Sequence, residues 1–429
     1  MKIRSKFLEE ILFNYISKAF LMGVGFILIP LVIRYLGSEK YGIWVTVMTL
    51  ISWAQISDFG IGNGLRNKIT ENYANKNIEN LKKYVSTAYI TLTGISVLIF
   101  FLGILIFYIL NFQNVFNTNI SEAEIKVCLI ITLFSFSVNF ILGLSKNIAN
   151  AIHKSYLVGF SQVFYSILLI IMILLLFKIQ VKEKLISISL IYFISTTIAN
   201  IVLSIKIFQE KYFQPKLINF DKNLVGEILG VGIKFFIIQV SLLILFSTDS
   251  IIITKFLGPQ QVTKYSLIEK IFSTIVNLYS ILLVGLWSKV SKIEAQGKLK
   301  SINKLMLKFK LTLIPVFLVT LVIFIFFNRI IFIWTKENLY YEFYIRFVFF
   351  IYTMLMVWSG ISLNIVNGLG KLKLQMWLYI IAAIFNIPLS IYFIKYLNLG
   401  IMGVKLATLI CLLPIGILIP YQVKKILNN

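Results

Sequence analysis

Long apolar runs, each separated from the next by a short polar break, follow one another through the whole chain. A membrane-spanning helix needs about 20 mostly apolar residues. By that measure the runs predict twelve spanning segments, near residues 8–35, 41–65, 84–110, 125–151, 156–177, 185–207, 225–255, 265–288, 309–328, 345–369, 374–395 and 400–421. We therefore expect an all-α integral membrane protein with about twelve transmembrane helices.

The composition indicates that lipid surrounds most of this chain. Hydrophobic residues make up 59% of it and charged residues 14%, which is about half the charged share of a soluble domain. The mean hydropathy is +0.90. Because no Pro-, Gly- or Ser-rich linker sets a soluble domain apart, we expect one membrane protein throughout and no soluble enzyme.

The basic residues lie between the apolar runs, although the net charge of +24 is high enough for a nucleic-acid-binding protein. Such a protein gathers its basic residues on a soluble face, so we expect no nucleic-acid partner. Lysines concentrate at the cytoplasmic ends of membrane helices, and the stretch Lys289 to Lys310 carries seven whereas Asn111 to Glu124 carries none. This bias predicts that both termini are cytoplasmic, and the long apolar run after the basic start predicts no removable signal peptide.

The sequence offers few ligands for a metal or cofactor. Cys128 and Cys411 both lie in apolar stretches, and His153 is the single histidine. A structural zinc site needs four ligands of these kinds. We therefore expect no disulfide framework, no metal, no cofactor and no catalytic residues.

A polar pattern in the fourth segment recurs in the tenth. Six residues reappear after 217 positions: Gly143, Ser145, Asn147, Ile148, Asn150 and Lys154 match Gly360, Ser362, Asn364, Ile365, Asn367 and Lys371. The turn Tyr35-Leu36-Gly37 before Lys40-Tyr41 likewise resembles Phe256-Leu257-Gly258 before Lys264-Tyr265. We interpret these matches as an internal duplication. It predicts two pseudo-symmetric six-helix bundles, residues 1–210 and 211–429, related by an axis along the membrane normal.

Four asparagines of this repeat are candidate substrate-binding residues. On a helix, Asn147 and Asn150 fall on one face, and so do Asn364 and Asn367. Two matched polar stripes predict two walls of one cavity between the bundles, at the membrane midplane. The alternative is that these asparagines only form hydrogen bonds between helices.

Several lysines lie inside apolar segments, where a charge is costly and normally faces a bundle interior or water. Lys18 and Lys234 stand at nearly the same depth in the first and seventh segments, so we expect both to face the cavity. Lys270 is a further cavity candidate, with an ion pair to its neighbour Glu269 as the alternative. We expect Lys405 to extend to the membrane interface.

Few acids accompany these lysines. Asp58 is expected to have a structural role beside Arg66. Asp249 and Glu269 are candidates for H+ or Na+ coupling, with a structural salt bridge between Asp249 and Lys255 as the alternative. The excess of lysines over carboxylates in the predicted interior favours an anionic ligand that carries phosphate or carboxylate.

The first hairpin carries the most specific motif. The stretch IPLVIRYLGSEKYGIW at residues 29–44, followed by DFGIG at residues 58–62, resembles the start of bacterial polysaccharide flippases of the O-antigen type. These belong to the multidrug/oligosaccharidyl-lipid/polysaccharide exporter superfamily.

This resemblance implies a specific transport function. In such flippases two six-helix bundles move a polyprenyl-diphosphate-linked oligosaccharide from the inner to the outer leaflet of the bacterial cytoplasmic membrane by alternating access. The resemblance also implies a cationic cavity within the membrane lipid. Lys18 and Lys234 lie on matching helices of it, where related lipid-linked precursor flippases often carry arginine.

Other functions stay open as alternatives. A multidrug or cation antiporter shares the fold, but a cationic interior repels a cationic drug. An integral-membrane glycan polymerase or ligase handles the same lipid carrier, but it needs catalytic acids or arginines on a sizeable outward loop, and the outward loops predicted here are short. A scaffold that transports nothing has no use for lysines at midplane depth. The flippase is therefore the leading hypothesis.

Overall fold

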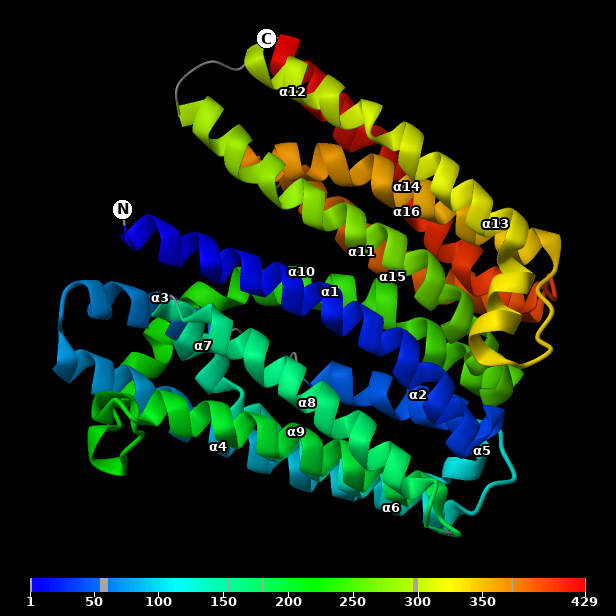
Figure 1. Cartoon of the computed structure of the whole chain (residues 1–429), viewed down its shortest axis with the longest axis horizontal. Coiled ribbons are helices and arrows are strands. Elements are labelled where there is room, and N and C mark those ends of the chain that lie inside the picture. Colours follow the sequence, from blue (N-terminus) through cyan, green and yellow to red (C-terminus); the bar gives the residue numbers. More distant parts are fainter. Residues whose placement is uncertain are drawn as a thin grey trace. The chain divides into compact units, whose positions relative to one another are not determined.

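The computed structural model describes residues 2–54, 61–152, 154–179, 181–295, 300–371 and 373–428. All regular elements in these ranges are helical, which confirms the predicted all-α fold class (Figure 1). Eleven of the described helices are long and apolar enough to span a membrane. Helices suit this setting because each satisfies its own backbone hydrogen bonds, which lipid cannot do.

Contacts divide the chain into two compact units, Met1–Gln239 and Val240–Asn429, named here the N unit and the C unit. The division falls inside a continuous helix, α10 (Lys222–Leu257). The bundle boundary predicted between residues 210 and 211 lies just before this helix and stays a prediction.

The N unit combines long helices with short connecting ones. Its elements are α1 (Lys2–Leu36), α2 (Ser38–Ala54), α3 (Ile61–Ala74), α4 (Ile78–Ile109), α5 (Phe112–Phe116), α6 (Glu122–Leu142), α7 (Leu144–Ala151), α8 (Ser155–Leu176), α9 (Lys184–Phe208), η2 (Lys211–Phe213), η3 (Leu217–Asn219) and the first part of α10. Helix α9 packs against both α6 and α8, and α8 also packs against α1 (Figure 1).

The C unit begins with the second part of α10. Its other elements are α11 (Pro259–Ala295), α12 (Lys300–Leu311), α13 (Leu313–Thr335), α14 (Phe343–Gly368), α15 (Lys373–Lys395) and α16 (Gly400–Asn428). Helix α14 packs against α11 and α16, and α16 packs against α15 (Figure 1).

The same turn closes the first hairpin of each unit. Gly37 after α1 has a φ of 79° and Gly258 after α10 has a φ of 86°, a left-handed conformation that glycine adopts because it has no Cβ. The Gly37 amide donates to the Ile33 carbonyl at 2.7 Å, and the Gly258 amide donates to the Thr254 carbonyl at 3.1 Å. Counted from these glycines, Lys264-Tyr265 lies three residues further into its helix than Lys40-Tyr41.

Two predicted segments of the N unit are each divided into separate helices. The fourth segment is broken at Gly143 into α6 and α7, whereas its counterpart α14 is continuous. In the second, α2 ends at Ala54 and α3 begins at Ile61; Asp58 lies outside the described residues. A Cβ on Gly64 would lie 2.2 Å from the carbonyl oxygen of Ile228, so the glycine allows α3 to approach the start of α10 closely.

Candidate ligand-binding site

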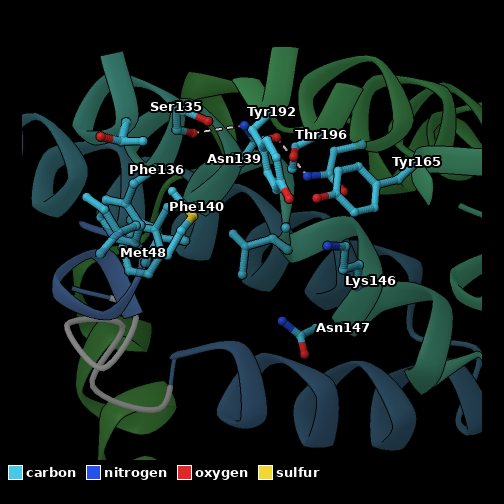
Figure 2. A pocket seen from close by; sticks show the side chains of 16 residues that line it. Met48, Ser135, Phe136, Asn139, Phe140, Lys146, Asn147, Tyr165, Tyr192 and Thr196 are labelled. Atoms are coloured by element: carbon cyan, nitrogen blue, oxygen red, sulfur yellow. Dashed lines mark hydrogen bonds between the residues drawn. The ribbon is translucent and has the colours of Figure 1, made fainter. Parts of the chain in front are cut away.

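A polar cavity of about 430 Å³ lies within the N unit (Figure 2). This volume is within the usual range of about 300–1,000 Å³ for ligand pockets. Helices α2, α4, α6, α7, α8 and α9 contribute to its lining. The polar residues that line it are Thr132, Ser135, Asn139, Lys146, Asn147, Tyr165, Tyr192, Thr196 and Asn200. Among the lining residues described there is no aspartate or glutamate.

Amide hydrogen bonds between α6 and α9 fix one wall of this cavity. Asn200 Nδ2 donates to Asn139 Oδ1 at 2.8 Å. Asn139 Nδ2 donates to the Ser135 carbonyl at 2.8 Å and to Thr197 Oγ1 at 3.0 Å. Because each of these bonds orients its neighbour, the wall presents amide and hydroxyl groups in fixed directions. Such groups can donate to and accept from the hydroxyls of a ligand.

Lys146 is the charged residue of the lining. It stands on α7, and Figure 2 shows its side chain between Tyr165 and Asn147. Within the described part of the chain Lys146 makes no ion pair. An ammonium group that is shielded from water and lacks a carboxylate partner attracts an anion strongly, so the cavity is suited to a ligand that combines an anionic group with hydroxyls.

An ion pair supports the end of α7, just beyond the cavity. Lys154 Nζ donates to Glu210 Oε1 at 2.6 Å, and the Tyr212 hydroxyl donates to Glu210 Oε2. Burial acts to raise the pKa of Glu210, but the hydrogen bonds from Lys154 and Tyr212 outweigh it and leave that pKa below its usual value. The hydrogen bond to Glu210 raises the pKa of Lys154. The pair therefore joins the α7–α8 junction to the segment after α9.

The predicted cavity residues have different outcomes. Asn147 lines the cavity of the N unit, whereas Asn150 is not among the lining residues. Asn364 Nδ2 donates to the Gly360 carbonyl of its own helix at 2.8 Å, and Asn367 is half-buried on the same helix. The side chains of Lys18 and Lys234 lie outside the described part of the structure. One cavity shared by the two bundles thus stays a prediction.

Asp249 and Glu269, the two ion-coupling candidates, lie in one cluster of the C unit, in which Asp249 is buried and Glu269 is 31% exposed. The Tyr265 hydroxyl donates to Asp249 Oδ2. Lys405 Nζ lies 2.7 Å from Glu269 Oε2. The expectation that Lys405 reaches the membrane interface is wrong, because its side chain is only 2% exposed.

The other lysines suggested as partners of these acids have different surroundings. Lys270 is half-buried on α11, and the described ion pair of Glu269 is with Lys405. The ammonium of Lys255, the suggested partner of Asp249, lies 5.9 Å from the centre of the Phe256 ring.

Sequence reasoning missed Lys146 and the role of Lys405. A signal for Lys146 was present, because it falls inside the repeated pattern and the residue 217 positions later is Leu363. A lysine that only one copy of a repeat carries is a candidate for a function that only that copy performs. For Lys405 no signal was available, since its partner Glu269 is far away in the sequence.

Comparisons with known proteins agree on one family. The family described as polysaccharide biosynthesis protein matches residues 7–287, more than half of the chain. A protein of Salmonella typhimurium, provisionally named an O-antigen transporter, is 26% identical over 414 residues, or 92% of this chain and 91% of that protein. A Yersinia pseudotuberculosis protein, provisionally named an O-antigen export protein, is 23% identical over 393 residues, or 89% of this chain and 87% of that one.

Two solved structures have the same fold. The inward-facing form of a multidrug resistance transporter of the MATE family, in the MOP superfamily, matches with a TM-score of 0.78 at 14% identity, over 95% of this chain and 94% of that one. The lipid II flippase MurJ in an inward closed form matches with a TM-score of 0.76 at 17% identity, over 96% and 87%. At these identities the likeness concerns the fold alone.

Proposed function

Because the chain belongs to the polysaccharide biosynthesis protein family, we propose that it is a flippase for polyprenyl-diphosphate-linked oligosaccharides. It moves them from the inner to the outer leaflet of the bacterial cytoplasmic membrane. The O-antigen transport named for two relatives supports this class of substrate. The fold shared with a flippase and an exporter supports transport over catalysis.

The observation that carries this proposal is the position of Lys146 in a polar cavity whose described lining has no acid. Lysine acts as a point charge for phosphate, so Lys146 attracts the diphosphate or an acidic sugar. Asn139, Asn147 and Asn200 are close enough to the same space to bind sugar hydroxyls. The two requirements of the substrate, charge and hydroxyl recognition, are met in one cavity.

We extend the proposal to the transport cycle. The lysine bias of the loops supports a topology with both termini in the cytoplasm. Lys18 and Lys234 then belong to a cavity that opens to one leaflet and afterwards to the other. An uncompensated negative charge that leaves the electrically negative interior gains about 2.3 kcal/mol per 100 mV of membrane potential, so we expect the rate to depend on that potential.

A multidrug antiporter is the second candidate, because a multidrug resistance transporter has the same fold. It requires an acid to attract its cationic drug. The cavity of the N unit offers a lysine in this place. The flippase is therefore the better match.

The test uses purified protein in vesicles that contain a fluorescent polyprenyl-diphosphate oligosaccharide. An impermeant reagent that modifies exposed sugars reports how much of the lipid has reached the outer leaflet. We expect transport by the wild type, a dependence on imposed potential, and loss of transport in Lys18→Ala/Lys234→Ala. Export of a cationic dye without movement of the oligosaccharide would favour the antiporter.

A further inference from the structure

Three charged side chains from three helices meet inside the C unit. Asp249 comes from α10, Glu269 from α11 and Lys405 from α16. Asp249 is 4% exposed and Lys405 is 2% exposed. Lys405 contacts Glu269 directly, and the charges of both residues act on Asp249. We name these three residues the charge cluster.

The charge cluster is not neutral when all its members are ionised. Two carboxylates and one ammonium leave one negative charge. Glu269 is 31% exposed, whereas Asp249 is only 4% exposed, and an uncompensated charge away from water is strongly unfavourable. One additional positive charge, either a proton or a metal cation, balances the cluster.

The surroundings of Lys405 hold it in its charged form. Its ammonium lies 3.9 Å from the centre of the Tyr352 ring, 5.1 Å from that of Phe349 and 5.5 Å from that of Tyr265. Aromatic faces attract a cation at these distances. With Glu269 at 2.7 Å, this ammonium fills the place that a bound metal cation would take between acid and rings.

Asp249 offers the position for the missing charge. Its Oδ2 accepts the Tyr265 hydroxyl, whereas its Oδ1 is buried and has no hydrogen-bond partner among the described residues. Buried carboxylate oxygens are normally satisfied, so Oδ1 is an available acceptor for a proton. Among the described residues, Tyr265 and Glu269 from α11, Tyr352 from α14 and Lys405 from α16 interact with Asp249, and Tyr379 from α15 interacts with Tyr352.

The N unit has no acids at the places that correspond to Asp249 and Glu269. A shift of 221 residues aligns Gly37 with Gly258 and pairs Asp249 with Leu28 and Glu269 with Met48. The same shift pairs Lys405 with Lys184. Leu28 and Met48 line a cavity of about 300 Å³ whose described lining has no charged side chain. Since the N unit forms this hairpin without acids at these two positions, and a buried ion pair adds little stability, stability alone does not explain Asp249 and Glu269.

We propose that the charge cluster binds one proton at Asp249 in each transport cycle and that Lys405 stands in for a metal cation, so that transport is coupled to H+ and not to Na+. This coupling rests on the proposed transport function. The proton adds to one carboxylate oxygen from one side of the membrane and leaves to the other side. No other bond changes.

The proton site is tested first without transport. Infrared spectra of the purified protein, recorded over a pH titration, show the C=O band of a buried protonated carboxyl. We expect Asp249→Asn to remove this band. Glu122→Gln, which alters an acid paired with Lys126 along one helix, should retain it. A band that persists in Asp249→Asn overturns the proton site.

Vesicle transport then tests the choice of ion. A gradient of about one pH unit biases a one-proton step about tenfold, and we expect wild-type transport to respond to it. A Na+ gradient at equal pH should have no effect, and a response to Na+ overturns the proposal. If the wild type moves no oligosaccharide under any gradient, the flippase fails, while the infrared result still decides the proton site.

The variant Lys405→Met tests whether the lysine takes the place of a metal cation. Without the lysine two acids face each other, so NaCl should raise the melting temperature of this variant relative to choline chloride and leave the wild type unchanged. The double variant Glu269→Gln/Lys405→Met removes acid and base together, is less prone to misfold, and should keep the infrared band of Asp249 with no response to Na+. Stabilisation of the wild type by Na+, or no response in Lys405→Met, overturns the role of Lys405.

Discussion

Helices α6 and α7 of the N unit correspond in the repeat to α14 of the C unit, but they carry different chemistry. A shift of 217 residues pairs Lys146 with Leu363 and Asn139 with Met356. Lys146 and Asn139 line a cavity, whereas Leu363 and Met356 pack against the hydrophobic core of the C unit. One copy of the repeat is therefore hollow and polar where the other is filled and apolar.

The first hairpins of the two units show the opposite difference. Here the N unit has the uncharged cavity of Leu28 and Met48, and the C unit has the charges of Asp249 and Glu269. The two units share the left-handed turn glycines Gly37 and Gly258 but differ in these buried residues. This divergence supports a division of work, in which the N unit binds the anionic substrate and the C unit binds the coupling ion.

Among the residues that differ between the two units, the largest effect is expected from Lys146→Met. The substrate loses its counter-charge in a shielded site, which corresponds to about 1.5–3 kcal/mol for a charged hydrogen bond and a fall of about 10–100-fold in vesicle transport. The matched control is Leu363→Met, an apolar exchange of similar volume at the corresponding place. Equal losses in both variants would contradict the difference between the units.

Asn139→Met gives the N unit the residue of the C unit. It leaves Asn200 Nδ2 and Thr197 Oγ1 without their partner in a buried wall, so we expect a loss of about 1–3 kcal/mol in the free energy of unfolding. Transport should fall several-fold because the wall loses its orientation. Thermal unfolding in detergent measures the first effect, with Met356→Leu as control. An unchanged melting temperature would show that the amide network does not support the wall.

A smaller effect separates the paired asparagines. Asn147→Ala should reduce transport about fivefold, as expected for one lost hydrogen bond to substrate of about 1 kcal/mol. Asn364→Ala should change it less, because Asn364 donates within its own helix. Equal losses would instead support the shared cavity predicted from the sequence.

The smallest effect is expected at Glu210, the ion-pair partner of Lys154 at the end of the repeated pattern. Lys154 pairs with Glu210, whereas its counterpart Lys371 makes no ion pair in the described part of the chain. Glu210→Gln should lower the unfolding free energy by about 0.5 kcal/mol, since the pair is partly exposed. The pKa of Glu210 is lowered, so its contribution exists above the ordinary carboxyl pKa and is lost as the pH falls through the lower folded-state value. Melting curves should therefore differ at neutral pH and converge in acid; a difference that grew in acid would contradict this sign.

Much of the fold was predictable because lipid imposes a simple rule on it. Apolar runs of sufficient length mark the helices, and glycine at a left-handed turn marks the shared hairpin of Gly37 and Gly258. The break at Gly143 was missed because a one-residue interruption changes neither apolar length nor composition.

The site was only partly predictable, because it depends on which helices meet. Asn147 was found through its spacing, and Asp249 and Glu269 through the rarity of acids in apolar segments. The association of Lys405 with Glu269 joins residues 136 positions apart, and no local pattern reports it. Likewise Lys146 becomes notable only when the cavity around it is known.

The most direct test of the division of work is the affinity of the purified protein for a short-chain polyprenyl-diphosphate oligosaccharide. Native mass spectrometry of the wild type, Lys146→Met and Asp249→Asn measures it at one pH. The account predicts that Lys146→Met weakens binding by about tenfold or more, the value of one charged hydrogen bond, whereas Asp249→Asn binds as the wild type does. Full affinity in Lys146→Met, or an equal loss in Asp249→Asn, would contradict the assignment of substrate binding to the N unit.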